Sequence, residues 1–259
     1  MSESVLVAAW CGVLGLLIGS FLNVVVWRVP RGESIVSPPS HCPRCDSRIA
    51  ARDNIPVLSW LLLRGRCRHC GEAISARYPM VEILTAAVFA ALGARFGLDA
   101  VLPAFLYLGA AGTALALIDL DTKRLPDVIT LPSYPVAAAL LAVAALAAGE
   151  WDTYLRALLG MAALYSGYFL VALISPRSMG FGDVKLAGVL GLYLGWLGWD
   201  VLAVGAFAGF FLGGVLGIAL LAAKRATRKS AIPFGPFMLL GALLAVLAGE
   251  PLADLWLRT

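Results

Sequence analysis

Charged side chains are scarce in this chain, and their scarcity is the first constraint on its fold. Only 14% of the 259 residues are charged, while 61% are hydrophobic. A soluble domain carries about a quarter charged residues and about half apolar ones. The composition therefore excludes an ordinary soluble domain and indicates a protein that crosses a membrane several times. The net charge of +4 gives no reason to expect a nucleic-acid partner.

Basic residues are missing from the start of the chain, where a secretory signal peptide would carry them. Residues 1–4 contain Glu3 and no lysine or arginine, so the first apolar run is expected to remain as a membrane span. Most of the apolar runs have 18 residues or more, enough to cross about 30 Å of hydrocarbon as a helix. The sequence thus predicts an all-α fold, a polytopic membrane helical bundle with about eight transmembrane helices. These cover residues 5–27, 83–94, 101–118, 128–149, 157–175, 186–199, 201–223 and 230–249.

One side of this predicted topology has few basic residues. With eight spans, 17 of the 20 lysines and arginines fall in loops that share the other side. Loops rich in lysine and arginine stay in the cytoplasm, so the richer side is predicted to be cytoplasmic and both chain ends to face outward. The poorer side keeps only Arg95, Arg156 and Arg258.

Several catalytic signatures are also missing. The chain has no GxSxG elbow and no HExxH helix, so nothing supports a serine or zinc protease. Residues 19–82 contain no GxGxxG fingerprint, so contacts to a nucleotide-like cofactor cannot be derived from spacing.

Four of the five cysteines lie in the one long polar segment, residues 28–78. Cys42 and Cys45 form CPRC, and Cys67 and Cys70 form CRHC. Two CxxC pairs are typical of a four-thiolate zinc site, because each two-residue gap lets both sulfurs reach one tetrahedral ion. Two disulfides are the alternative, which a reducing cytoplasm disfavours. So short a segment buries little core of its own, so a metal would stabilise its fold.

The remaining cysteine and the two histidines are not expected to bind this metal. Cys11 lies in the first span and is predicted to be a small buried hydrophobe. His41 and His69 flank the thiols, but four cysteines already complete the site. Both histidines are therefore predicted to be surface residues.

Two aspartates lie at the ends of apolar runs, where a charged side chain is unfavourable in a membrane span. Asp119 closes an apolar run in ALIDLDTKRLPD, and Asp183 opens another in MGFGDVKLAG. A carboxylate at membrane depth costs ~2.5–3.5 kcal/mol on insertion scales, so such a residue is a functional hypothesis by default. If the fold brings the two together, one keeps a proton while the other acts as a base. The base would activate a water that attacks a peptide carbonyl, and the protonated partner would assist the leaving amine.

Other interpretations of these acids stay open. Asp121 lies two residues after Asp119 and so on a different side of a helix, and Asp127 is typical of a helix start. Asp119 could instead be an interfacial acid that pairs with the basic residues at 123–124. Asp183 could be a first-turn acid that the helix dipole favours.

Several motifs in a fixed order carry a resemblance to a known family. They are GSFLNVVVWRVPRGES at 19–34, the CPRC and CRHC pairs, NIPVLSWLLLRGRCRHCGEAISARYPMVE at 54–82, ALIDLDTKRLPD at 116–127, GFGDVKLAG at 180–188 and IPFGPFM at 232–238. The chain resembles the type IV prepilin peptidases, of the GxGD membrane aspartic protease group. GxGD alone is weak, but the ordered set is specific and reaches from the first span to the last.

The resemblance implies an enzyme with two activities. Such enzymes cut type IV prepilins, or the pseudopilins of type II secretion, after a glycine that ends a short basic leader. They then N-methylate the new terminal residue, usually phenylalanine, with S-adenosylmethionine. The implied location is the bacterial cytoplasmic (inner) membrane, with the active site facing the cytoplasm. The implied partners are a prepilin or pseudopilin and membrane lipid; the oligomeric state is not predicted.

By motif position, the resemblance makes Asp119 and Asp183 the catalytic pair. Support for the catalytic loop would come from Gly180, Gly182 and Lys185. The resemblance associates methyl transfer with the cysteine-containing region, where Gly65 is a candidate. The implied division is a first transmembrane helix at 1–27, a cytoplasmic zinc domain associated with methyl transfer at 28–78, and a protease core at 79–259.

Three other functions remain as alternatives: a peptidase without methyltransferase activity, a noncatalytic membrane assembly factor, and a transporter. The intact cysteine segment favours both enzymatic activities. Transporters often contain internal repeats, and no clear repeat is present.

Overall fold

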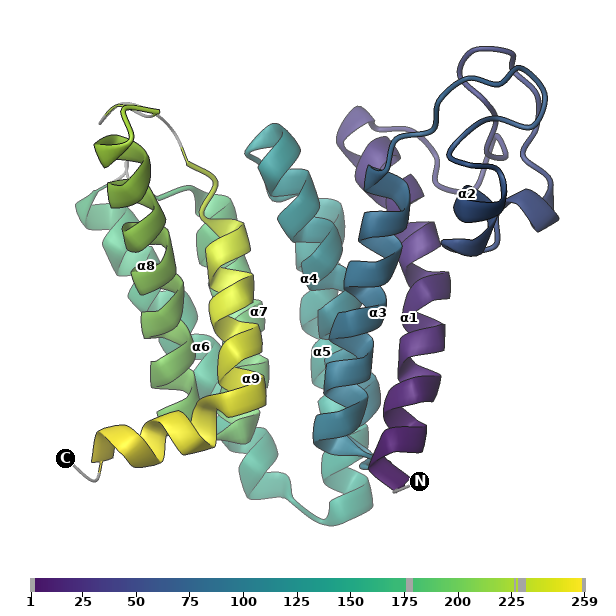
Figure 1. Cartoon of the computed structure of the whole chain (residues 1–259). Helices are drawn as coiled ribbons and strands as arrows, with labels where there is room; N and C mark the ends of the chain where they lie inside the picture. The colour runs from purple at the N-terminus through teal and green to yellow at the C-terminus, as the bar shows by residue number, and fades with distance from the viewer. Residues whose placement is uncertain (1–2, 176–178, 226, 228–231, 258–259) are drawn as a thin grey trace. The chain divides into compact units, whose positions relative to one another are not determined.

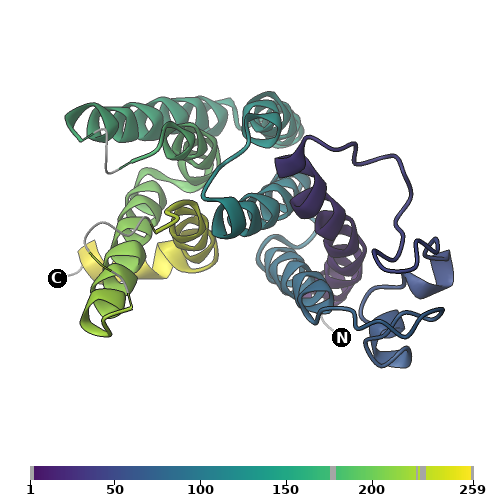
Figure 2. The ribbon, with the colours of Figure 1, turned by 90° about the horizontal axis from the view of Figure 1, so that it is seen from above.

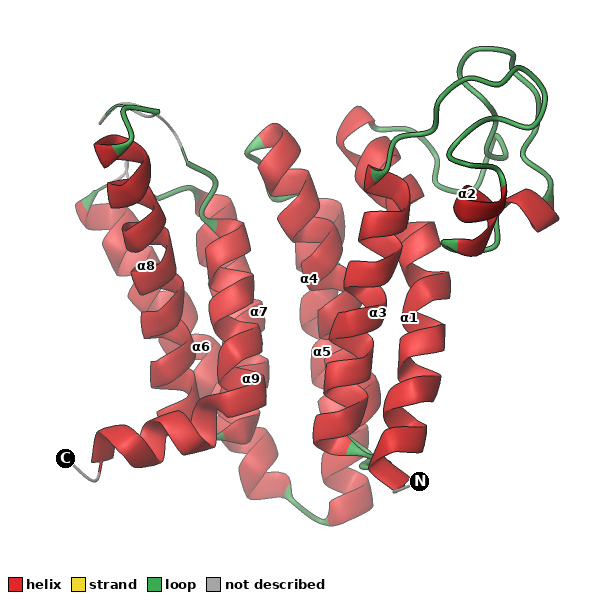
Figure 3. Cartoon of the chain, in the orientation of Figure 1, coloured by secondary structure: helices red, strands yellow, loops and turns green. Residues whose placement is uncertain are grey.

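The computed structural model describes residues 3–175, 179–225, 227 and 232–257 (Figure 1). The chain forms two compact units, Met1–Leu102 and Pro103–Thr259. Over the described ranges the long elements are all helices, and no strand is formed (Figure 3). Eight of these helices have 17 residues or more, which confirms the predicted all-α bundle.

Six helices are long and apolar enough to cross a membrane, so the chain is a multi-pass membrane protein. They are α1 (Glu3–Arg28), α3 (Arg77–Phe96), α4 (Leu102–Thr122), α5 (Asp127–Ala148), α6 (Trp151–Ile174) and α8 (Trp199–Ala222). The two other long helices have shorter apolar stretches. They are α7 (Phe181–Leu197) and α9 (Gly235–Leu257), whose apolar part is Gly235–Ala248.

Helix α7 extends in front of the predicted apolar span at 186–199. The helix begins at Phe181, so both Asp183 and Lys185 lie inside its first turns. Both polar side chains have partners: Asp183 accepts a backbone N–H, and Lys185 pairs with Asp127. Because these partners satisfy the two side chains, the helix continues through them instead of being interrupted.

In the first unit, α1 packs along α3 through small residues. A Cβ added at Gly15 would lie 2.7 Å from the Cα of Ala86, and one at Gly19 would lie 2.7 Å from the Cα of Glu82. Such a GxxxG arrangement lets two membrane helices approach backbone to backbone. Cys11 is 6% exposed and faces Gly93 in the same contact, so its prediction as a small buried hydrophobe is confirmed.

In the second unit, α6 packs along α7 and α8 packs along α9, as the end-on view in Figure 2 shows. Arg156 on α6 fixes the far end of α7. Its Nε donates to the carbonyl of Gly195 at 2.8 Å, and its Nη2 donates to that of Trp196 at 2.6 Å. A cation there satisfies terminal carbonyls and opposes the negative end of the helix dipole. This contact ties the last turn of α7 to α6.

Candidate functional site

Asp119 lies in the last turn of α4 and is buried, with 4% of its surface exposed. Its Oδ2 accepts a hydrogen bond from the backbone N–H of Gly235 at 3.0 Å. Gly235 is the first residue of α9, so this N–H has no partner within its own helix. The positive end of the α9 dipole therefore faces the carboxylate. No ion pair joins Asp119 to the basic residues at 123–124 within the described part of the chain, so that alternative gains no support.

Asp183 lies in the first turn of α7 and is half-buried. Its Oδ2 accepts the N–H of Gly180 at 3.1 Å, and its own N–H donates to the carbonyl of Gly180 at 3.0 Å. This reciprocal turn is the geometry of a first-turn acid, as one interpretation of the sequence predicted. The same turn also fixes the direction in which the carboxylate points.

The second unit brings these two acids together. Leu125, in the α4–α5 connection, touches both of their glycine neighbours. A Cβ at Gly182 would lie 3.1 Å from the Cβ of Leu125, and one at Gly235 would lie 3.2 Å from its Cδ2. Asp119 is also near enough to Asp183 for their charges to interact. Two carboxylates, each facing the start of a helix, therefore share one small region.

The sequence analysis did not identify Gly235 as a site residue. A Cβ at this position would lie 2.8 Å from the Oδ2 of Asp119, so only glycine brings the first N–H of α9 this close to the carboxylate. Gly235 lies in the IPFGPFM motif at 232–238, but the motif alone indicates no role for any single residue in it. Asp121, in contrast, is exposed and lies away from the buried Asp119, as the helix spacing predicted.

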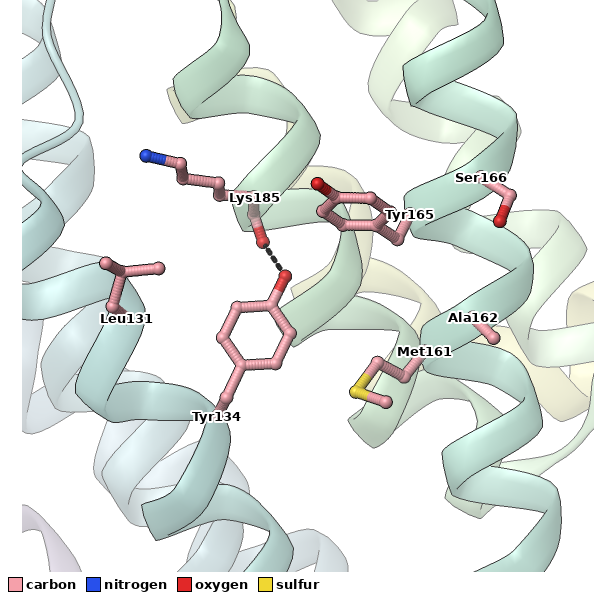
Figure 4. Close-up of a pocket in the computed structure, with 7 residues that line it drawn as sticks. All are labelled: Leu131, Tyr134, Met161, Ala162, Tyr165, Ser166 and Lys185. Atoms are coloured by element: carbon pink, nitrogen blue, oxygen red, sulfur yellow. Dashed lines mark hydrogen bonds between the residues drawn. The ribbon is translucent and has the colours of Figure 1, made fainter.

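Lys185 ties the start of α7 to α5. Its Nζ lies 2.7 and 2.8 Å from the two carboxylate oxygens of Asp127, the first residue of α5. The Tyr134 hydroxyl, also on α5, donates to the carbonyl of Lys185 at 2.6 Å (Figure 4). Gly188 makes room for this contact, since a Cβ there would collide with the Tyr134 oxygen.

A mostly apolar cavity of about 440 Å³ lies beside this connection (Figure 4). Side chains from α5, α6 and α7 surround it: Leu131, Tyr134, Met161, Ala162, Tyr165, Ser166 and Lys185. Lys185 therefore both lines this cavity and links α7 to α5.

The four cysteines of the polar segment converge in the first unit. The sulfurs of Cys42, Cys45, Cys67 and Cys70 all lie within 4.8 Å of one another, and those of Cys42 and Cys70 are 3.8 Å apart. A tetrahedral site with Zn–S bonds of about 2.3 Å needs sulfurs about 3.8 Å apart. All four are free cysteines, so the disulfide alternative is not formed. The cluster could hold one metal ion.

Two similar loops present these thiols. Cys42 donates its N–H to the carbonyl of Ser47 at 3.0 Å, and Cys67 donates to that of Glu72 at 2.8 Å, at the same position in each loop. Hydrogen bonds with Ser47 lower the pKa of Cys45 to about 6, whereas burial and contacts with the other three thiols raise the pKa of Cys70 to about 12. A lowered pKa favours the thiolate, which is the form that binds a metal.

Gly65 and the two histidines lie around this cluster. Gly65 has φ of +64°, and a Cβ there would lie 2.9 Å from the ring of Trp60. The glycine thus forms the turn on which the Trp60 indole packs, and that indole donates to the carbonyl of Ile74 at 3.0 Å. His41 and His69 are exposed, as predicted, and the four cysteines cluster without them.

Comparisons with known proteins agree with this architecture. Residues 13–96 match the bacterial peptidase A24 N-terminal domain, and residues 106–222 match the type IV leader peptidase family. A protein of Stutzerimonas stutzeri is 34% identical over 95% of this chain and 92% of its own length. One of Pseudomonas putida is 36% identical over 92% and 89%, and one of Myxococcus xanthus is 42% identical over 84% and 64%.

All three relatives bear the name prepilin leader peptidase/N-methyltransferase. No solved structure matches the chain. The first two relatives are matched over almost their whole length, and the two family regions cover the cysteine cluster and both aspartates. The chain therefore belongs to the type IV leader peptidase family.

Proposed function

We propose that this protein cleaves the basic leader peptide of type IV prepilins or pseudopilins after a glycine and N-methylates the new terminal residue. Family membership supports both activities. The observation that carries the peptidase proposal is the placement of Asp119 and Asp183 in one region, each facing a helix N-terminus.

In this proposal Asp119 and Asp183 are the catalytic residues and share a single proton. Two neighbouring carboxylates cannot both ionise cheaply, so one is charged and the other protonated. The charged group takes a proton from a water, which attacks the scissile carbonyl, while the protonated group hydrogen-bonds to the carbonyl oxygen. The proton then passes to the leaving amine. The N–H groups of Gly180 and Gly235 hold the two carboxylates in position throughout.

We assign the four thiolates to Zn²⁺, which would hold the two cysteine loops together. The sulfur spacing and the all-thiolate donor set support this metal. S-adenosylmethionine would supply the methyl group, and residues 19–82 would bear that activity. Gly65 would contribute by forming the turn that positions Trp60. The Trp60 indole occupies the space beside the glycine, so a larger residue at position 65 would displace it.

The proposed location is the bacterial cytoplasmic membrane, with the acid pair at the cytoplasmic face. Asp119 ends α4 and Asp183 begins α7, next to the loops rich in basic residues. Of the residues counted for this orientation, Arg177, Arg228, Lys229 and Arg258 lie outside the described ranges. A basic leader in the cytoplasm would reach the acid pair with electrostatic assistance. The proposed domains remain residues 1–27, 28–78 and 79–259.

The function is tested with purified protein in detergent, a synthetic prepilin and S-adenosylmethionine. Mass spectrometry should detect a mature fragment cut after the glycine and heavier by about 14 Da, the mass of one transferred methyl group. Cleavage without the added mass would indicate the alternative of a peptidase that lacks methyl transfer. An intact prepilin, with protein that remains folded, would contradict the proposal.

Lys185 acts in this account as a positioning residue. Its ion pair with Asp127 and the Tyr134 hydrogen bond hold the start of α7 against the start of α5. Leu125, two residues before Asp127, touches the glycines next to both acids. The ion pair therefore fixes one carboxylate relative to the other, while Gly180 and Gly182 allow the tight turn before α7.

Lys185→Met and Asp127→Asn should each lower kcat by about 10- to 100-fold, because small misplacements of catalytic groups have effects of this size. KM should change little, since neither residue is proposed to touch the substrate. The exchanged pair Asp127→Lys with Lys185→Asp should recover much of the lost kcat. A purely structural role predicts lower thermal stability with unchanged kcat in the folded fraction, and that result would contradict the assignment.

A further inference from the structure

The short helix α2 (Leu58–Leu62) has its polarity reversed relative to a water-soluble helix. Its one buried residue is Ser59, whose hydroxyl donates to the carbonyl of Arg52 at 2.9 Å and accepts the N–H of Ile55 at 2.9 Å. Its leucines point outward: Leu62 is 73% exposed and Leu61 58%. A domain surrounded by water would bury the leucines and expose the serine.

The position of α2 along α3 is fixed by a hydrogen bond. The N–H of Val57, the residue before α2, donates to the Oε2 of Glu82 at 2.7 Å. Glu82 is buried and lies five residues after the start of α3, or about 7.5 Å along the helix at 1.5 Å per residue. The start of α2 therefore lies beside the second turn of α3, directly before the apolar run at 83–94.

The surroundings of α2 match the boundary between lipid headgroups and acyl chains. Met80, Ile83 and Leu84 on the adjacent turns of α3 are exposed apolar residues, as expected of a lipid-facing surface. Trp27 is exposed at the end of α1, with the Arg31 guanidinium 3.6 Å above its ring. Exposed tryptophans mark membrane interfaces. Exposed arginines flank α2 at positions 52, 64 and 66, which suits anionic headgroups.

We infer that α2 is an interfacial membrane anchor: its exposed leucines enter the acyl boundary and its flanking arginines bind anionic lipid headgroups. Interfacial helices lie at this boundary with their apolar side chains toward the acyl chains, in agreement with the place of α2 beside Glu82, directly before the apolar run at 83–94. The anchor holds the two cysteine loops at a fixed height above the membrane, because Trp60 on α2 donates to Ile74 in the second loop.

The test uses the full chain in vesicles of phosphatidylglycerol and phosphatidylethanolamine, without a pilin. The photoreactive residue p-benzoylphenylalanine is placed at position 62 on α2 and, as the matched control, at Ile49, an exposed apolar residue in the first cysteine loop. After irradiation, mass spectrometry should find phospholipid adducts on the peptide that contains position 62 and few on the control. Because no substrate is present, the result does not depend on the proposed activity.

Two outcomes of the cross-linking would overturn the anchor. Equal lipid adducts at positions 49 and 62 would mean that the whole domain rests on the lipid, and cross-links to a second protein chain at 62 would identify a protein partner instead. A second measurement guards against an artefact of the probe. In Leu61→Glu with Leu62→Glu, amide hydrogen exchange over residues 55–63 should accelerate in vesicles while the metal content stays unchanged; unaltered exchange would also overturn the anchor.

Discussion

Replacement of Asp119 by asparagine should abolish prepilin cleavage, with a loss of at least about 10²- to 10⁴-fold, the contribution usual for an acid–base group. Asparagine keeps the size of the side chain, and its carbonyl oxygen can still accept the N–H of Gly235. It cannot exchange a proton with water or with the leaving amine. Asp183→Asn should have the same effect for the same reason, and its turn with Gly180 should persist. Cleavage is measured by mass spectrometry on purified, folded variants.

Asp121→Asn is the matched control, because Asp121 lies two residues away on the same helix and is exposed. It should keep most of the cleavage rate. An inactive Asp121→Asn together with an active Asp119→Asn would show that the catalytic residue of this DxD motif was assigned incorrectly.

Loss of the metal should separate the two activities. Cys67→Ser removes one of four converging thiolates, and a small domain without its metal ion unfolds. The helices of the second unit are held by their own packing, for example through Arg156 and α7. Methyl transfer should therefore fall much more than cleavage, and the zinc content should fall from about one ion per chain, the number for a single four-thiolate site.

The reciprocal variant provides the control for this separation. Asp183→Asn should still methylate a pre-cleaved peptide that begins with phenylalanine, and it should retain its zinc. Equal loss of both activities in both variants would indicate a single shared site, and the proposed division of residues 28–78 from the protease core would fail.

The helices and the cysteine cluster could be predicted from the sequence because each depends on local pattern. Apolar runs determine spans, and a CxxC gap brings two sulfurs to one ion wherever the pairs are placed. The predicted apolar span at 186–199 leaves out the first turns of α7, because a hydropathy pattern treats Asp183 and Lys185 as interruptions. Their partners, Gly180 and Asp127, are known only from the three-dimensional arrangement.

The candidate site was predictable in its acids but not in its supporting contacts. The disfavoured positions of Asp119 and Asp183 were visible in the sequence, whereas the bond from Gly235 spans 116 positions of the chain. The outward leucines of α2 were hidden in a segment that appeared merely polar on average. Such features depend on which helix ends meet, and single-sequence patterns carry little information about that.

The most direct test of the central claim is the cleavage rate of the double variant Asp119→Asn with Asp183→Asn, measured beside both single variants over long incubations. Residues that act as one catalytic unit show non-additive effects. If the two aspartates share one proton at one scissile bond, the double variant should be no slower than the slower single variant, within a few-fold. Losses that multiply in the double variant would contradict a shared acid pair and indicate two independent roles.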